Sequence, residues 1–285
     1  MPVTYLVAPQ WQGSTSARAL RLVDGAAAIG AELPRSALRI EPPSGAGSSL
    51  DSGVARLSSI QSVRDDILTA LRQQQQEQEQ ENELGAEMTT VIIGGDCGVE
   101  LGAIQHAVAR QDLVVVWLDA HGDLNTPDSS PSGAFGGMVL RTLLGEGPAT
   151  ALLPVALTPG RVILAGARAL DDAESDFIAA SGLCYLPPEM LSEESLSAAI
   201  LASGARSVYL HIDLDILDPV EFSSVGSPEP FGLSLVTLLA LIAAARAVLP
   251  VAGAGITGFA PPTPDAAAND LSSILRILGA VSKKI

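Results

Sequence analysis

The feature that most constrains the fold of this chain is a succession of short apolar runs, each ending in a polar turn and followed by a helical pattern. The run Leu113–Leu118 is apolar throughout, which is typical of a strand buried in a parallel sheet. Strands are expected at Val3–Val7, Leu38–Ile40, Thr89–Ile93, Leu113–Leu118, Val162–Ala165, Leu183–Leu186, Ser207–Ile212 and Val251–Thr257. This alternation of strands and helices predicts one doubly wound α/β sheet.

Helical patterns fill the intervals, and no linker divides the chain, so we expect a single domain over residues 1–285. Helices are expected at Ala17–Leu33, Ser58–Leu84, Val99–Ala109, Leu191–Ala202, Leu235–Val248 and Ala266–Val281, with shorter ones that end at Leu144 or follow Asp172. The second helix ends in a tail of glutamine and glutamate that is expected to be solvated and to carry no chemistry.

The acidic composition limits the possible partners. The formal net charge is −16 at pH 7, so nucleic acid and anionic membranes are repelled and a small cationic substrate is attracted. No apolar run reaches the ~20 residues of a membrane span, and the pattern of a signal peptide is missing, which leads us to expect a cytoplasmic location. Two cysteines are too few for a disulfide framework, and Cys184 is expected simply to be packed.

Two of the expected strands end in clusters of ionisable residues. Asp119 and His121, two positions apart, project from the same side of an extended chain, and Asp123 follows in the same series. Asp213 and Asp215 repeat the arrangement after another strand. Burying like charges a few ångströms apart is costly unless cations neutralise them, so these residues predict a metal site. Either loop alone is equally explained as a turn with aspartate caps.

A third polar strand end, Gly94–Gly98, contains Cys97 at the point where a strand becomes a helix. The helix amides there are expected to lower the pKa of the thiol, whereas a small buried apolar role is the alternative. Ligands bind outside the carboxyl ends of the strands in such sheets, and the loop Gln10–Ser14 is expected to border the site. Carboxylates with one or two softer ligands favour manganese, zinc or a similar pair of divalent ions, which can share and activate one water for hydrolysis.

Taken together, three motifs resemble those of the ureohydrolase family, which contains arginase, agmatinase and formimidoylglutamase. The motifs are Gly94–Cys97, Asp119–Asp123 with Asn125–Pro127, and Asp213–Pro219. The resemblance implies a three-layer α/β/α fold with a mostly parallel sheet, a binuclear manganese site, hydrolysis of a guanidino or amidino C–N bond by a metal-bridged hydroxide, and homo-oligomers (trimers or hexamers).

The resemblance also implies roles for individual residues. Asp119 and Asp213 would bridge the two metals, with Cys97 and Asp123 completing one shell and His121 and Asp215 the other, and Asp123 as the catalytic hydrogen-bond partner of the hydroxide. The substrate would be held by Asn125, Ser132 and Asp171, although Asp171 is equally explained as a helix N-cap.

The chain departs from the family pattern at three places. Cys97 replaces a histidine, which shifts the expected metal from manganese towards zinc or iron. Gly136 stands where arginases have a proton-transferring histidine, and the run 257–262 lacks the glutamate that clamps a guanidinium.

Two histidines and two alternative functions complete the predictions from the sequence. His211, which is most simply a core histidine, is alternatively a partner of a ligand or a stand-in ligand, and His106 is expected to carry no role. A cysteine nucleophile is a remote alternative for Cys97. A catalytically impaired pseudoenzyme that serves as a scaffold or regulatory subunit is the alternative to the hydrolase.

Overall fold

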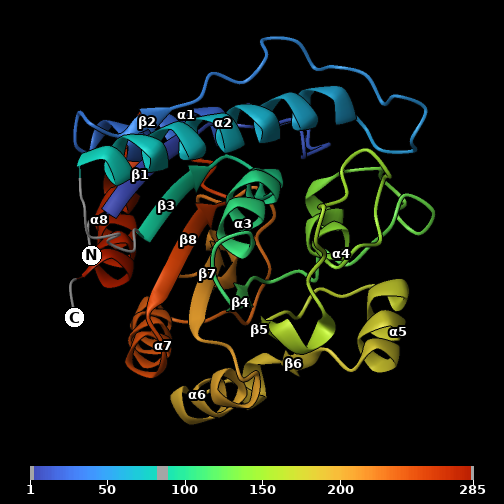
Figure 1. The fold of residues 1–285 in the computed structure, drawn as a ribbon, viewed down its shortest axis with the longest axis vertical. Coiled ribbons are helices and arrows are strands. Elements are labelled where there is room, and N and C mark those ends of the chain that lie inside the picture. Colours follow the sequence, from blue (N-terminus) through green and yellow to red (C-terminus); the bar gives the residue numbers. More distant parts are fainter. Residues whose placement is uncertain (1–2, 82–88, 284–285) are drawn as a thin grey trace.

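The structure, a computed structural model, describes residues 3–81 and 89–283. Its eight described strands form one sheet in the order β2-β1-β3-β8-β7-β4-β5-β6, and every pair of neighbours is parallel (Figure 1). The strands are β1 (Val3–Ala8), β2 (Leu38–Arg39), β3 (Thr89–Gly94), β4 (Leu113–Leu118), β5 (Val162–Ala165), β6 (Cys184–Leu186), β7 (Ser207–Asp213) and β8 (Val251–Thr257). The expected parallel α/β sheet is confirmed.

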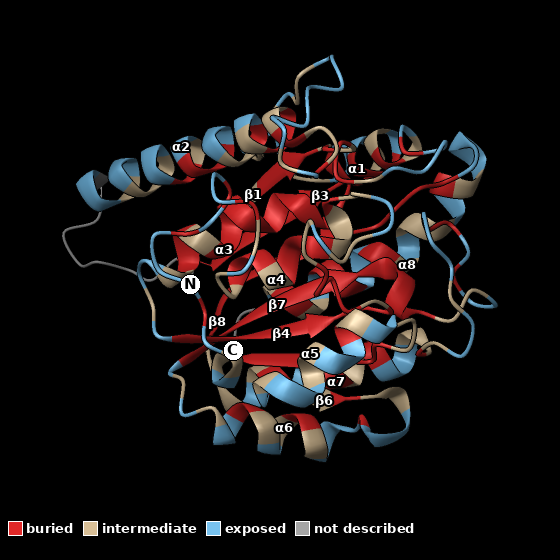
Figure 2. Cartoon of the chain, turned by 90° about the vertical axis from the view of Figure 1, so that its right-hand side faces the viewer, coloured by how far each residue is buried: buried red, intermediate tan, exposed pale blue. Residues whose placement is uncertain are grey.

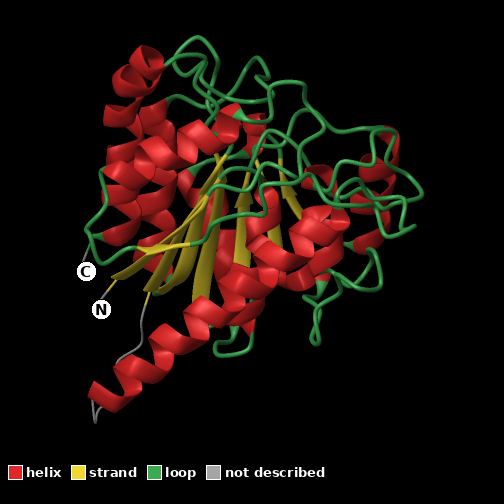
Figure 3. Ribbon diagram, turned by 90° about the horizontal axis from the view of Figure 1, so that it is seen from above, coloured by secondary structure: helices red, strands yellow, loops and turns green. Residues whose placement is uncertain are grey.

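Helices cover both faces of this sheet, so that the strands lie between two helical layers (Figure 3). Residues from α1, α6, α7 and α8 pack on one face, and residues from α2, α3 and α4 pack on the other. The helices are α1 (Arg21–Ala31), α2 (Leu57–Glu81), α3 (Glu100–Val108), α4 (Val139–Leu143), α5 (Asp172–Ser181), α6 (Glu193–Ala202), α7 (Leu235–Val248) and α8 (Pro264–Ser282).

Side chains that alternate along each strand fill the hydrophobic cores on the two faces of the sheet. In β4, Val114 and Val116 belong to the core beneath α7 and α8, whereas Val115 and Trp117 belong to the core beneath α2 and α3. All six residues of β4 are buried, as Figure 2 shows for the central strands. A strand buried on both faces has to be apolar throughout, which accounts for the uninterrupted run in the sequence.

Helix ends differ from the expected ones for local reasons. Helix α1 ends at Ala31 rather than at Leu33 because Pro34 disfavours helical backbone in the residue before it. Helix α6 begins at Glu193 rather than at Leu191 because Ser192 forms a capping box with Ser195. The expected end of the second helix at Leu84 lies outside the described residues.

Two further observations concern the surface. The tail of α2 is solvated as expected, since no residue from 72 to 80 is buried. Among the described residues, no helix combines the length and the apolar character that crossing a bilayer requires.

Candidate metal centre

The candidate site lies at the carboxyl ends of the four central strands β3, β8, β7 and β4, which are consecutive neighbours in the sheet. Cys97 follows β3, Asp119 follows β4, Asp213 is the last residue of β7, and Thr257 is the last residue of β8. Parallel strands end at one edge of a sheet, so residues more than a hundred positions apart meet there. The Cys97 thiol, for example, donates to Asp213 Oδ2 over 3.2 Å.

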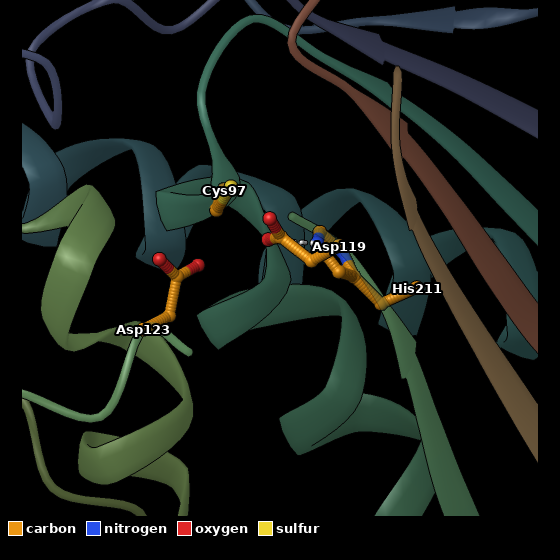
Figure 4. A group of neighbouring side chains, drawn as sticks. All are labelled: Cys97, Asp119, Asp123 and His211. Carbon is orange, nitrogen blue, oxygen red and sulfur yellow. Dashed lines mark ion pairs between the residues drawn. The ribbon is translucent and has the colours of Figure 1, made fainter. Parts of the chain in front are cut away.

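Four side chains from these strand ends form a buried cluster. Cys97, Asp119, Asp123 and His211 each offer one donor atom, and these atoms all lie within 4.8 Å of one another. Figure 4 shows their side chains converging from separate segments of the chain. The cluster contains one sulfur, one imidazole nitrogen and two carboxylate oxygens, a donor set that binds divalent transition metals.

A second group, Asp119, His121 and Asp215, satisfies the same 4.8 Å criterion and shares Asp119 with the first. His121 Nδ1 lies 3.0 Å from Asp215 Oδ2 and 3.4 Å from Asp119 Oδ1. A carboxylate common to two groups is the arrangement expected of a bridging ligand. Asp213 belongs to neither group, so its bridging role stays a prediction.

Local backbone geometry directs these side chains. Asp119 Oδ1 accepts from the backbone amide of His121 over 2.7 Å, and Oδ2 accepts from the indole of Trp117 over 3.2 Å. Asp123 adopts a φ of 51°, in the left-handed region that L-residues other than glycine rarely occupy. Backbone strain of this kind persists where the surrounding structure imposes it, and it is concentrated at functional sites.

The two imidazoles of the site are strongly basic in the protein without a metal. Burial lowers the pKa of His121, but hydrogen bonds to Asp119 and Asp215 outweigh it and raise the pKa to about 12. Burial likewise opposes protonation of His211, and the carboxylates of Asp119 and Glu100 raise its pKa to about 10. Without metal, both rings therefore carry positive charge at neutral pH and partly neutralise the aspartates.

Two of the remaining acids are hard to ionise in the metal-free site. Burial, together with Asp119, raises the pKa of Asp123 well above its ordinary value, and burial, together with Asp213, does the same for Asp215. These two carboxyls hold protons unless a cation lies beside them. The structure thus favours either protons or metal ions at this site.

Cys97 corrects one expectation. Burial and the carboxylates of Asp123 and Asp213 raise the pKa of its thiol well above the ordinary value, instead of lowering it. The turn Cys97–Val99 spans three residues of 3₁₀ helix, and its first amides are taken by Asp96, whose Oδ1 accepts from Gly98. A thiol that stays protonated is a poor nucleophile, so the thiolate requires a cation next to it.

Two polar atoms of the cluster that lack a hydrogen-bond partner in the described part of the chain fit a metal ion. Among the described residues, Asp123 Oδ2 and His211 Nε2 are buried and have no hydrogen-bond partner. Buried polar atoms without a partner are rare in folded proteins and call for a missing ligand. Because both atoms belong to the same four-residue cluster, the donor set present suits a divalent ion.

The cluster opens into a cavity of about 570 Å³. The acidic side chains that line it are Asp96, Asp119, Asp123, Asp171, Glu174, Asp213 and Asp215, whereas none of the described lining residues is a lysine or an arginine. Gly13 and Ser14 also line it, which confirms that the loop Gln10–Ser14 borders the site. A cavity with this lining attracts small cations.

The three expected substrate-side residues also line the cavity. Asn125 Nδ2 donates to Asp171 Oδ2 over 2.7 Å, so these two side chains form one polar unit. Asp171 is in addition the N-cap of α5, in a capping box with Glu174. Ser132 is exposed at the mouth, where its hydroxyl accepts from the amide of Ala134. Their contact with a substrate stays a prediction.

Gly258 explains why the run after β8 carries no carboxylate there. Its φ is 84°, and a Cβ atom built on it would lie 2.1 Å from Asp213 Oδ1. A side chain at this position, glutamate included, would force the Asp213 carboxylate to move and would adopt a backbone conformation that favours glycine.

Three buried acids near the site were not assigned a role from the sequence, namely Asp96, Glu100 and Glu174. Asp96 fixes the loop at the cavity mouth, since it accepts from Gln10 Nε2 and from the backbone amide of Gly13. Glu100 is fully buried beneath the cluster and bonds His211. A glutamate within an otherwise apolar helix face was the only sequence signal available for Glu100.

Comparisons with known proteins point to one family. The sequence model of the arginase family matches residues 11–276. An arginase from Bacillus subtilis is 34% identical over 154 residues, which is 50% of this chain and 52% of that protein, so the match spans about half the length of each.

Solved structures agree in fold over the full chain. The arginase of Entamoeba histolytica, in complex with L-ornithine, superposes with a TM-score of 0.80 at 23% identity and covers 99% of both chains. Formimidoylglutamase from Bacillus subtilis superposes with a TM-score of 0.72 at 18% identity, over 99% of this chain and 88% of that one.

Proposed function

The chain belongs to the arginase family, and from that premise we propose that it hydrolyses a guanidino or amidino C–N bond with the help of two divalent metal ions. The observation that carries the proposal is the buried donor cluster with two orphaned atoms, which opens into an acidic cavity. The proposed metal-binding residues are Cys97, Asp119, His121, Asp123, Asp213 and Asp215. Manganese is our first expectation, with zinc or iron as the alternatives that Cys97 introduces.

The acidic lining supports a cationic substrate. A guanidinium or amidinium group entering the cavity meets several carboxylates and no competing lysine or arginine among the described lining residues. The carboxylates would draw the cation to the deep end of the cavity, and the Asn125–Asp171 pair lies on its wall to hold the polar end of the molecule. The substrate differs from arginine in our proposal because position 258 carries no clamping carboxylate.

Divalent ions, when bound, would supply Lewis acidity that lowers the pKa of a shared water and so provides the nucleophile at neutral pH. Asp123 has the freedom to assist that water because its Oδ2 atom is buried and has no hydrogen-bond partner among the described residues. A carboxylate in this position accepts a hydrogen bond from the attacking group and orients it.

Metal content and product release test the proposal together. We expect purified protein to contain about two metal equivalents and to release urea or ammonia from at least one member of a panel of guanidino and amidino compounds. Asp119→Asn is expected to lose metal and turnover, whereas the exposed Asp176→Asn on α5 is the matched control and retains both. Failure of the wild-type protein to bind manganese, zinc or iron would refute the proposal.

A catalytically impaired relative remains the second candidate. The observation that favours it is the charge on His121 and His211, which neutralises part of the aspartate cluster without a metal. A scaffold or regulatory subunit of this kind would bind metal weakly and release no product. A homo-oligomer, trimeric or hexameric, and a cytoplasmic location stay predictions.

A further inference from the structure

His211 is the least expected member of the metal cluster, because a fully buried histidine on a strand is ordinarily a satisfied core residue. Its two ring nitrogens differ sharply. Nδ1 lies 2.8 Å from Glu100 Oε1, which is a short hydrogen bond between buried groups. Nε2 points into the cluster and has no hydrogen-bond partner in the described part of the chain. The ring is thus held from one side and open on the other.

Packing fixes the plane of the ring. The indole of Trp117 stacks on it, with ring centroids 3.6 Å apart and an interplanar angle of 23°. Trp117 also donates to Asp119 through Nε1, so one side chain positions both the imidazole and the neighbouring carboxylate. Such support holds Nε2 in a set direction.

Glu100 is itself held in place for this contact. Its second oxygen, Oε2, accepts from the hydroxyl of Tyr209 over 2.6 Å. The carboxylate lies where Gly255 has no side chain, since a Cβ atom there would lie 1.6 Å from Oε1. A buried glutamate with both oxygens engaged is built to accept the Nδ1 proton of His211.

This arrangement determines which ring nitrogen of His211 can bind a metal ion. A neutral imidazole that donates from Nδ1 keeps its lone pair on Nε2, and carboxylate–histidine–metal triads use this tautomer to orient a ligand. In the metal-free protein the charged ring carries its second proton on Nε2, which lies 3.6 Å from Asp119 Oδ2. A bound ion would take the place of that proton.

We infer that His211 is a metal ligand through Nε2 and that Glu100 is its positioning residue. This inference rests on the proposed function. The ion then lies among Cys97, Asp119, Asp123 and His211, with sulfur, nitrogen and two oxygen donors. Thiolate and imidazole are softer ligands than carboxylates, so this position selects zinc or cobalt over manganese. The group Asp119, His121 and Asp215 contains no sulfur, so the two positions differ in metal preference.

Cadmium-113 NMR on protein with nitrogen-15-labelled histidine tests the inference directly, without an activity assay. The chain has three histidines, so each can be assigned with single variants. We expect one cadmium-bound resonance to couple to Nε2 of His211. The coupling disappears in His211→Asn and persists in His106→Asn, because His106 lies on α3 with its ring beside Arg110.

A second variant separates ligation from folding. Glu100→Gln keeps an acceptor for Nδ1 but removes the negative charge, and we expect it to weaken zinc affinity about 10–100-fold while the number of zinc ions at saturation stays unchanged. Cobalt-loaded wild-type protein should show thiolate-to-cobalt absorption from Cys97.

The outcomes are distinguishable. Cadmium bound by the wild-type protein with coupling to His121 alone, while His211 keeps both ring protons, would overturn this inference and leave the proposed function standing. Equal zinc affinity in wild-type protein and Glu100→Gln would overturn the role of Glu100. A wild-type protein that binds neither cadmium nor zinc would overturn both proposals.

Discussion

Replacing Gly258 by alanine tests whether the candidate site depends on the close approach of β8 to Asp213. The new Cβ atom would lie 2.1 Å from Asp213 Oδ1, so the carboxylate has to move. That movement breaks the hydrogen bonds that Asp213 accepts from Thr257 and from the amide of Asp215, over 2.8 and 3.0 Å. The Gly258→Ala protein is therefore expected to be less stable and to bind metal less tightly.

The magnitude has two parts. Left-handed backbone at an alanine costs about 1–2 kcal/mol, and losing the two hydrogen bonds to a charged group costs about 3–6 kcal/mol more. We therefore expect the free energy of unfolding to fall by about 4–8 kcal/mol.

Two other glycines separate these parts. Gly182→Ala, at φ 70° with no atom within 4 Å of its Cβ position, should show only the backbone cost. Gly279→Ala, inside α8 and equally open, should stabilise the protein by about 0.5–1 kcal/mol.

Urea denaturation of the three variants, with and without added metal, measures these differences by linear extrapolation. Metal affinity is measured in parallel by titration calorimetry, and only Gly258→Ala is expected to lose it. The reasoning is refuted if Gly258→Ala costs no more than Gly182→Ala and retains wild-type metal affinity.

Two further predictions concern the cavity wall and the pH dependence. Asp171→Ala should lower the free energy of unfolding by about 0.5–2 kcal/mol through loss of the helix cap, and it should also raise KM. Ser192→Ala removes a cap remote from the cavity, so it should lower the free energy of unfolding by the same amount and leave KM unchanged. Equal KM values in the two variants would contradict a substrate role for Asp171. In protein freed of metal by a chelator, the pKa of His121 is raised to about 12 and that of His211 to about 10, so both rings stabilise the fold while they are charged. This stabilisation is fully present below about pH 6.5 and is lost as pH rises towards 10, by at most about 1.4 kcal/mol per pH unit for each imidazole. Unfolding measurements from pH 6.5 to 10 on wild-type protein and His121→Asn check this, and identical slopes would show that His121 does not contribute.

Patterns of local sequence were sufficient to predict the strands and most of the helices. A strand such as β4 is recognisable because burial on both faces demands an apolar run, and α7 (Leu235–Val248) and β8 (Val251–Thr257) have the expected bounds. The strand-end position of Asp119, Asp213 and Cys97 followed from the same reasoning. Sequence reasoning could therefore locate the edge of the sheet that carries the site.

Contacts between remote segments were not predictable in this way. Glu100 bonds His211 across 111 positions, and the space for its carboxylate depends on Gly255 in a third segment. The raised pKa of Cys97 depends likewise on burial and on Asp123 and Asp213, which only the family resemblance, and no local pattern, placed beside it. Local helix geometry suggested the opposite shift, and burial with three-dimensional charge placement outweighed it.

The order of the sheet has a consequence for biosynthesis. Strand β8 lies between β3 and β7, although it is the last of the eight described strands to be translated. Before it is inserted, β2-β1-β3 and β7-β4-β5-β6 are two separate partial sheets, each with an open edge that invites wrong pairing. Cys97 belongs to one of these halves, and Asp119 and Asp213 belong to the other. The cluster of Cys97, Asp119, Asp123 and His211 is therefore completed only when β8 joins the two halves, whereas Asp119, His121 and Asp215 come together within one of them.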